Sequence, residues 1–154
     1  MLTEAQQEFF MRECLVLCKE ALLKNEVPIA ALIIKDGAII GRGINRRTQD
    51  NDPTAHAEIV ALREAGKTLG AWNLSGCDLI VTLEPCAMCA GAIVNARIDN
   101  VYYGATDLRF GYCGTLGNIA ADIRLNHRAN VISGILEKEC LMPIKQFFLD
   151  KRKK

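Results

Sequence analysis

The chain has 154 residues, half of them hydrophobic and 24% charged, a composition that suits one globular domain over residues 1–154 and excludes a disordered chain. Its formal net charge of +1 excludes a general electrostatic attraction to nucleic acid, so any nucleic-acid surface must be local. Seven cysteines are an odd number, which argues against a complete disulfide framework and favours metal or core roles.

The first third of the chain predicts one helix and a β-hairpin. A capping-box signature at Thr3, followed by apolar residues at helical spacing, predicts a helix over 3–23. Apolar, β-branched runs over 28–34 and 38–44 predict two strands. Asp36-Gly37 lies between these runs and predicts the tight turn that joins them.

Two further helices are predicted to start at prolines. Asp52 can cap a helix that has Pro53 at its first position and that ends before Gly66. Pro85 then starts another helix, which runs to about Arg97. Proline suits the first helical position because its missing N–H has no partner there in any case.

Strands and a closing helix complete the pattern. Apolar runs predict strands over 78–83, 101–104 and 131–135, and a helix over 137–151 follows them. Strands that alternate with helices after an initial hairpin predict an α/β domain, in three α/β/α layers around a mixed five-stranded sheet.

The sequence shows no sign of export or of membrane insertion. Glu4, Glu8 and Arg12 interrupt the first apolar residues, unlike the basic start and apolar centre of a secretion signal. The longest apolar stretches, such as 29–34, are far shorter than the roughly 20 residues that span a bilayer. We therefore expect a cytoplasmic protein.

Three residues form a candidate zinc site: His56, Cys86 and Cys89. Cysteines three apart lie on one face of a helix, and a helix N-terminus favours the thiolate that zinc requires. A catalytic zinc has three protein ligands and an open position for water, whereas a structural site is normally closed by four. The three residues therefore predict a catalytic zinc ion, one per chain.

Glu58 is the candidate catalytic residue. It lies two residues after His56, so it does not share a helix face with that ligand and can stand beside the metal. Zinc lowers the pKa of its bound water, and a nearby carboxylate can take the proton to give zinc-bound hydroxide at neutral pH. Glu58 would then pass the proton on, as a proton shuttle.

Other interpretations of these residues stay open. The segment His56-Ala57-Glu58 can be ordinary helix, with Cys86 and Cys89 in the core, since free cysteine is often buried. A structural zinc site completed by Cys113 or Cys77 is a second alternative.

Three further residues are weaker candidates for a metal-binding or catalytic role. Cys14 and Cys18 share one helix face and could bind a metal, but without a nearby histidine core packing is favoured. His127 could be a base, an RNA contact or a hydrogen-bonded structural histidine. Cys140 and the pair Tyr102-Tyr103 are interpreted as core residues.

The motifs that carry a family resemblance extend through most of the chain. They are Val27-Pro28, GRGIN at 41–45, DPTAHAEIVALREAG at 52–66, TLEPCAMCAGA at 82–92, Tyr103-Gly104-Ala105 with Asp107, LNHR at 125–128, and GILEKEC at 134–140 before Phe147-Phe148. With these motifs the chain resembles the bacterial tRNA-specific adenosine deaminases of the cytidine deaminase superfamily, from about residue 3 to residue 151.

The resemblance implies hydrolytic deamination of adenosine to inosine at the wobble position of a tRNA with a tRNA-Arg type anticodon. It also implies a cytidine deaminase-like fold and a homodimer. By the same resemblance, Asn45 and the backbone of Ala57 hold the flipped base. Asp107 contacts the sugar region, and Asn126 and Phe148 grip the anticodon stem-loop.

Two regions depart from the family pattern. Family members usually have glycine where Ala30 stands, and small residues where the chain has FGYCG at 110–114. A bulky Tyr112 could alter the sequence preference for RNA or pack into the fold, and packing is the interpretation that we favour.

Two other functions fit parts of the same pattern. HAE with PCxxC marks the whole superfamily, which includes deaminases of a free base or nucleoside such as guanine or cytidine. A non-enzymatic RNA-binding module that keeps zinc for folding is a third interpretation. Glu58 argues against it, because a structural site needs no unligated carboxylate beside an open coordination position.

Basic and aromatic residues gather near the C-terminus: Lys145, Phe147, Phe148, Lys151, Arg152, Lys153 and Lys154. RNA binding needs phosphate neutralisation and faces on which bases stack, so this segment is a candidate RNA contact. The alternative is a solvated helix end with Phe147 or Phe148 buried against the sheet.

Overall fold

A computed structural model describes residues 1–153, and Lys154 of the candidate RNA contact lies outside the described residues. The elements follow in this order: α1 (Glu4–Leu23), β1 (Ala30–Lys35), β2 (Ala38–Ile44), α2 (Ala57–Leu69), β3 (Cys77–Leu83), α3 (Ala87–Ala96), β4 (Asn100–Ala105), β5 (Asn130–Ile132) and α4 (Glu137–Arg152).

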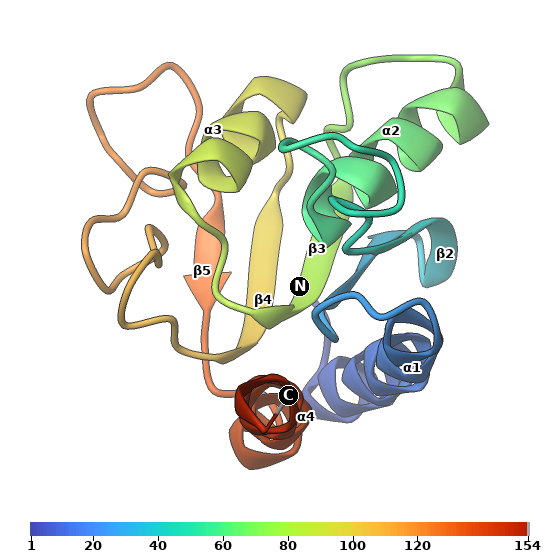
Figure 1. The fold of residues 1–154 in the computed structure, drawn as a ribbon. Coiled ribbons are helices and arrows are strands. Elements are labelled where there is room, and N and C mark those ends of the chain that lie inside the picture. The colour runs from blue at the N-terminus through green and yellow to red at the C-terminus, as the bar shows by residue number, and fades with distance from the viewer. Residues whose placement is uncertain (154) are drawn as a thin grey trace.

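The strands form one mixed sheet in the order β2-β1-β3-β4-β5. β1 is antiparallel to β2 and β3, whereas β3, β4 and β5 are parallel. Helices α2 and α3 cover one face of the sheet, and α1 and α4 cover the other (Figure 1). The predicted three-layer α/β/α fold with a mixed five-stranded sheet is confirmed.

The interior strand β1 is buried on both faces. Ala31 and Ile33 pack in the layer of α2 and α3, and Ala30, Leu32 and Ile34 pack in the layer of α1 and α4. Side chains alternate between the faces of a strand, so a strand covered on both sides is continuously apolar. This explains why the run over 29–34 shows no polar alternation.

The first helix and the hairpin form as predicted. Thr3 Oγ1 accepts a hydrogen bond from the Gln6 amide at 3.1 Å, and Gln6 Oε1 accepts one from the Thr3 amide at 2.9 Å, which completes the capping box of α1. Asp36 and Gly37 have positive φ values of 49° and 77°, as a tight hairpin turn requires of its two central residues.

The predicted start of α2 is wrong by about four residues. Asp52 Oδ1 accepts hydrogen bonds from the backbone N–H and the hydroxyl of Thr54, at 2.8 and 2.7 Å, and so closes a local turn instead of capping the helix. The helix begins at Ala57 with His56 as its N-cap. It continues past Gly66 and stops at Gly70, which adopts the left-handed conformation.

The predicted start of α3 and the extent of β5 also differ from the structure. Pro85 precedes the helix, Cys86 is its N-cap, and Ala87 is its first residue. The last strand was predicted to reach residue 135, but Gly134, with a φ of 81°, turns the chain toward α4 after Asn130–Ile132.

Strand β2 packs closely against the start of α2. A Cβ atom at Gly43 would overlap the carbonyl oxygen of Ala57, so only glycine permits this approach. The contact places the N-terminus of α2 beside the end of β2. Within the described residues, no helix combines the length and the apolar character needed to cross a membrane.

Candidate metal centre

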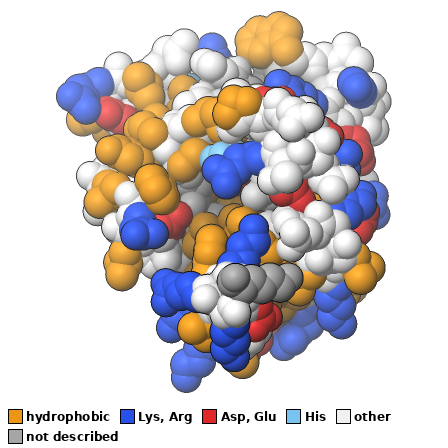
Figure 2. All heavy atoms as spheres, in the orientation of Figure 1, with side chains coloured by type: hydrophobic (Ala, Val, Ile, Leu, Met, Phe, Trp, Pro, Cys, Tyr) orange, Lys and Arg blue, Asp and Glu red, His pale blue; other side chains and the backbone are white. Residues whose placement is uncertain are grey.

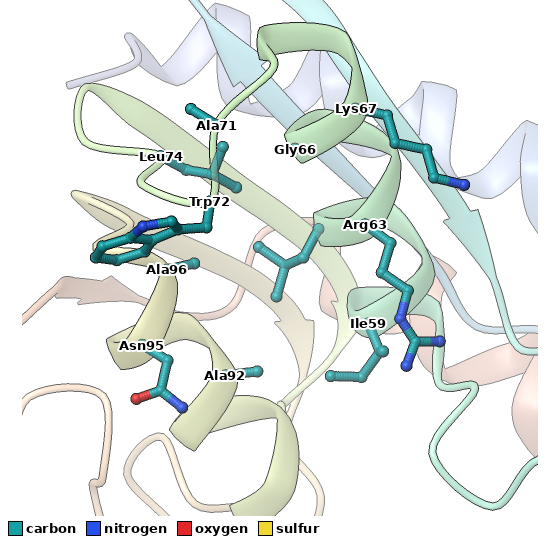
Figure 3. A pocket seen from close by; sticks show the side chains of 11 residues that line it. Ile59, Arg63, Gly66, Lys67, Ala71, Trp72, Leu74, Ala92, Asn95 and Ala96 are labelled. Atoms are coloured by element: carbon teal, nitrogen blue, oxygen red, sulfur yellow. The ribbon is translucent and has the colours of Figure 1, made fainter.

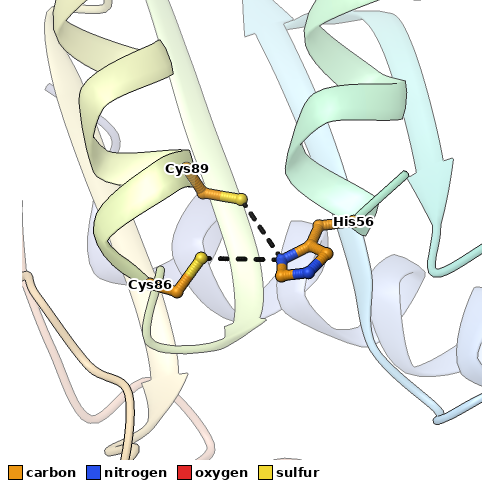
Figure 4. Close-up of side chains that lie close together, drawn as sticks. All are labelled: His56, Cys86 and Cys89. Atoms are coloured by element: carbon orange, nitrogen blue, oxygen red, sulfur yellow. Dashed lines mark hydrogen bonds between the residues drawn. The ribbon is translucent and has the colours of Figure 1, made fainter. Parts of the chain in front are cut away.

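The N-termini of α2 and α3 bring the three predicted ligands together. His56 is the N-cap of α2, Cys86 is the N-cap of α3, and Cys89 lies in the first turn of α3. Neither N-cap side chain makes a capping hydrogen bond to its own helix. The side chains instead point toward one another across the gap between the two helices (Figure 4).

The distances within this group fit a zinc ion. Cys86 Sγ and Cys89 Sγ each lie 3.6 Å from His56 Nδ1, and the three ligand atoms lie within 4.8 Å of one another. With Zn–N of about 2.0 Å, Zn–S of about 2.3 Å and a tetrahedral angle, nitrogen and sulfur are about 3.5 Å apart. The geometry therefore suits three of the four ligands of tetrahedral zinc.

The structure gives no support to a fourth cysteine ligand. Among the described residues, the group that can hold a metal contains His56, Cys86 and Cys89 and no other residue. Cys77 is the first residue of β3, whereas Cys86 follows the other end of that strand. Cys113 is buried, and burial raises the pKa of its thiol to about 12, but it is not a member of the group within ligand distance. Three protein ligands are the number typical of a catalytic zinc site, whereas a structural site normally has four.

The two thiols of the group differ in acidity. A hydrogen bond from Cys89 is the largest influence on Cys86 and, together with His56, lowers the pKa of its thiol to about 4. The same hydrogen bond and burial raise the pKa of Cys89 well above its ordinary value. The pKa of His56 is raised, chiefly by Cys86. Cys86 is thus the thiolate of the metal-free group, and Cys89 is its proton donor.

Glu58 lies beside this group and is 5% exposed. Burial raises the pKa of its carboxyl group to about 7, and the negative charge of Cys86 acts in the same direction. A carboxyl group with a pKa near neutrality can both accept and release a proton at physiological pH. The burial and the raised pKa of Glu58 are compatible with the proton-transfer role that the sequence suggests, which stays a prediction.

Two of the predicted substrate-binding residues lie next to the metal group. Asn45 follows β2, is 6% exposed, and accepts a hydrogen bond from the Arg47 amide at 3.0 Å through Oδ1. Its amide NH₂ is left to donate to a ligand. Ala57 adjoins both His56 and Glu58 as the first residue of α2.

Asp107 lies in the connection after β4. Its Oδ1 accepts hydrogen bonds from the amides of Arg109 and Phe110 at 3.0 and 3.1 Å, so the carboxylate closes a turn in its own loop. The antiparallel bridge between Cys86 and Gly111 brings this loop against the start of α3. The structure therefore places the loop of Asp107 at the edge of the metal group.

The other two predicted substrate-binding residues come from more distant segments. Asn126 is exposed in the connection before β5, and Phe148 is 45% exposed on α4. Phe147 is buried, and the Lys151 ammonium lies 4.9 Å from the centre of its ring. Part of the candidate RNA contact thus belongs to the core, which is the alternative described above. Figure 2 shows further Lys and Arg side chains around the end of α4.

The weaker candidates for a metal-binding or catalytic role have structural roles in the fold. Cys14, Cys18 and Cys140 are buried in the layer between the sheet and helices α1 and α4, as predicted. His127 Nε2 lies 2.7 Å from the carbonyl oxygen of Ile98, which gives it a structural hydrogen bond. Tyr112 packs against the core between the sheet and helices α2 and α3, which agrees with the interpretation that we favoured.

Sequence reasoning missed two buried carboxylates that hold loops, one of them next to the ligand segment of Cys86. Glu26 accepts hydrogen bonds from the amides of Thr48 and Gln49, in the loop after β2. Glu84 accepts four hydrogen bonds from the loop after β4. The available signal for Glu84 was a glutamate directly after an apolar strand, since a charged residue is rarely buried without partners.

Comparison with known proteins gives a consistent result. The family model described as the cytidine and deoxycytidylate deaminase zinc-binding region matches residues 4–105. A Bacillus subtilis strain 168 protein named tRNA-specific adenosine deaminase is 46% identical over 149 residues, which cover 97% of this chain and 92% of the relative. A Haemophilus influenzae protein of the same name is 41% identical over 146 residues, which cover 94% of this chain and 84% of the relative.

Two solved structures are also similar. One comes from a study of A-to-I editing by tRNA:A34 deaminases at the wobble position of transfer RNA. It has a TM-score of 0.84 and 43% identity, and the match covers 88% of this chain and 98% of the other. The second is a guanine deaminase from Bacillus subtilis, with a TM-score of 0.61 and 46% identity over 64% of each chain.

Proposed function

The chain belongs to the cytidine and deoxycytidylate deaminase family, and from this we propose that it is a zinc-dependent hydrolase that converts adenosine to inosine at the wobble position of tRNA. The observation that carries the proposal is the three-ligand group with a buried, unligated carboxylate beside it. The relatives at 41–46% identity favour tRNA as the substrate, and we propose a tRNA-Arg type anticodon.

The proposed metal ligands are His56 Nδ1, Cys86 Sγ and Cys89 Sγ. Zinc held there would supply a Lewis acid that makes water nucleophilic at neutral pH. The N-termini of α2 and α3 face the same place, and the partial positive charge of a helix N-terminus stabilises the cysteine thiolates.

Glu58 carries protons in the proposed reaction. It takes a proton from the attacking water, whose oxygen adds to C6 of adenine, and delivers that proton to N1 of the ring. It then carries the second proton of the water to the departing amine. Water and adenosine thus become inosine and ammonia, and the carboxylate returns to its starting state.

The remaining site residues are proposed to bind the nucleotide. Asn45, through its amide NH₂, and the backbone of Ala57, the first residue of α2, together hold the flipped base beside Glu58. Asp107 contacts the sugar region, and Asn126 and Phe148 contact the anticodon stem-loop. Phe148 supports this role because it is an aromatic residue that is 45% exposed and so accessible to a base.

A free-base deaminase is the second candidate function, and the similarity to a guanine deaminase favours it. The same metal group and the same proton carrier would serve both substrates. The two candidates differ in whether the protein needs contacts to the polynucleotide around the reacting base.

The substrate prediction is that the purified zinc protein forms inosine at the wobble position of a tRNA-Arg type stem-loop. Its kcat/KM for this RNA should exceed that for free guanine or cytidine by at least about 10³-fold, because remote contacts supply binding energy. Nucleoside analysis after digestion measures inosine, and chromatography measures the free bases. Efficient turnover of free guanine without inosine in RNA would support the second candidate, and no turnover would support a binding module.

We further propose a homodimer that forms through a groove between α2 and α3. The groove has a volume of about 570 Å³ and a largely apolar lining that includes Ile59, Leu62, Leu74 and Ala96 (Figure 3). Trp72 lines it with 70% of its surface exposed, and the Arg97 guanidinium lies 5.7 Å from the ring centre. Exposed apolar patches that contain tryptophan are typical of protein interfaces.

Replacing Trp72 with alanine should weaken dimer association by about 30-fold, the loss typical of an interface hot spot. Sedimentation equilibrium over a concentration series measures the association constant. Met142→Ala is the matched control, because Met142 is 69% exposed but lies on α4, outside the groove. Equal association constants for Trp72→Ala and the wild type would place the dimer interface elsewhere.

A cytoplasmic location belongs to the same proposal. All seven cysteines are unpaired in the structure, as expected in a reducing compartment, and the proposed substrate is a tRNA.

A further inference from the structure

Glu84 is a buried carboxylate that the proposed chemistry does not use. It is 2% exposed and lies between the end of β3 and the Pro85-Cys86 segment. Within residues 1–153, no Lys or Arg side chain forms an ion pair with it. A buried charge without a cation is stable only when hydrogen-bond donors replace its water.

These donors come from one segment, the loop over 106–119. Glu84 Oε1 accepts from the Asp107 amide at 3.1 Å and from the Thr115 hydroxyl. Glu84 Oε2 accepts from the amides of Cys113 and Thr115, at 3.0 and 3.1 Å. Both oxygens are thus saturated, which leaves Glu84 neither the access nor the free lone pairs of a proton carrier.

The same loop lies against the metal group. The Tyr112 amide donates to the carbonyl oxygen of Pro85 at 2.9 Å, and Gly111 pairs with the ligand Cys86. A Cβ at Gly111 would overlap the Glu84 carboxylate and would lie 2.6 Å from the carbonyl oxygen of Asp107. Glycine is therefore required for the loop to close around the carboxylate.

We propose that Glu84 is a positioning residue that fixes the 106–119 loop as one wall of the substrate site. Its negative charge is needed because all four groups that face it are donors. A glutamine there would present an NH₂ group to at least one of these donors and would lose that hydrogen bond. The inference rests on the proposed function in one respect, namely that the wall contacts an RNA substrate.

The proposal predicts a separation of substrate binding from chemistry. Glu84 is not a member of the metal group, and its side-chain hydrogen bonds all go to the loop, so a loosened loop should weaken substrate binding more than it slows turnover. In Glu84→Gln we expect the KM for a tRNA-Arg type stem-loop to rise by about tenfold, with kcat within about threefold of wild type. The zinc content should stay at about one ion per chain.

Hydrogen exchange tests the positioning role without any substrate. In zinc-loaded Glu84→Gln, the amides of Asp107, Cys113 and Thr115 should exchange at least about tenfold faster than in the wild type. Glu26→Gln is the matched control, because Glu26 is equally buried and holds the loop after β2 instead. It should leave exchange at these three amides unchanged.

Thr115→Val removes only the hydroxyl donor and should give a smaller effect, which keeps the test decisive if Glu84→Gln does not fold.

Unchanged exchange at the three amides in both Glu84→Gln and Thr115→Val would overturn the proposal. A fall in kcat at constant KM would also overturn it, because that result would assign Glu84 to the chemistry. If the wild type deaminates no RNA, the proposed function fails by itself. The exchange data then still decide whether Glu84 holds the loop.

Discussion

Replacing Glu58 with alanine should lower kcat for inosine formation by about 10³-fold or more while the protein keeps about one zinc ion per chain. A general acid-base group typically contributes about 10²–10⁴-fold, and Glu58 is used twice in each turnover. The side chain is buried beside the metal group but is not one of its three members. Single-turnover kinetics on a stem-loop RNA and metal analysis of the same sample measure both quantities.

Glu64→Ala is the matched control for this variant. Glu64 lies on the same helix as Glu58, but it is exposed and only accepts a hydrogen bond from the Arg42 amide. Its replacement should leave kcat within about twofold of the wild-type value, as is usual for surface substitutions. A Glu58→Ala protein that retains zinc and more than about a third of wild-type activity would remove Glu58 from the mechanism.

Replacing Cys89 with alanine should reduce bound zinc to less than about a tenth of an ion per chain and abolish activity. The remaining pair, His56 and Cys86, cannot hold the ion against a chelator. Loss of the ion should also remove the stabilisation that zinc gives to the folded state, about 2.7 kcal/mol at a zinc concentration of 100 times Kd. Metal analysis after dialysis and thermal unfolding with and without zinc measure these effects.

Cys113→Ala is the informative control, because Cys113 is the buried cysteine that could have closed the site as a fourth ligand. Its absence from the metal group predicts that this variant keeps its zinc. Equal zinc loss in Cys89→Ala and Cys113→Ala would indicate a closed, structural site. In that case the proposed catalytic role of the metal would be wrong.

The affinity of the metal-free protein for zinc should also depend on pH. The raised pKa of Cys89 means that its thiol is protonated at neutral pH, and this proton must leave when the sulfur binds zinc. The lowered pKa of Cys86, about 4, means that this residue is already a thiolate. Zinc affinity should therefore rise as pH rises, with release of the Cys89 proton.

Features that depend on near neighbours in the chain were predictable from the sequence. The capping box of α1 joins residues three apart, and the turn at Asp36-Gly37 requires only two positive φ values. The spacing of Cys86 and Cys89 likewise places two sulfurs on one side of a helix start. These features form as predicted because tertiary contacts do not favour another local structure at these residues.

The helix starts show where local rules gave the wrong answer. Asp52 and Pro53 have the composition of a helix start, but the Asp52 side chain closes a turn with Thr54 and α2 begins at Ala57. The first residue of the helix, Ala57, packs closely on Gly43. The delay matters for the site, because it makes His56 an N-cap residue whose side chain can face α3.

The sequence by itself indicated the layered α/β fold, the three candidate ligands and the neighbouring carboxylate, since these follow from residue type, local spacing and family motifs. The tertiary structure alone decided that His56 Nδ1 lies 3.6 Å from both sulfurs, which are 30 and 33 residues away in the chain. It also decided that Glu84 holds a loop 23 to 31 residues further along. Such contacts are made when the sheet brings distant segments together, and no periodicity or local propensity encodes the distance between two side chains that meet only through the packed core.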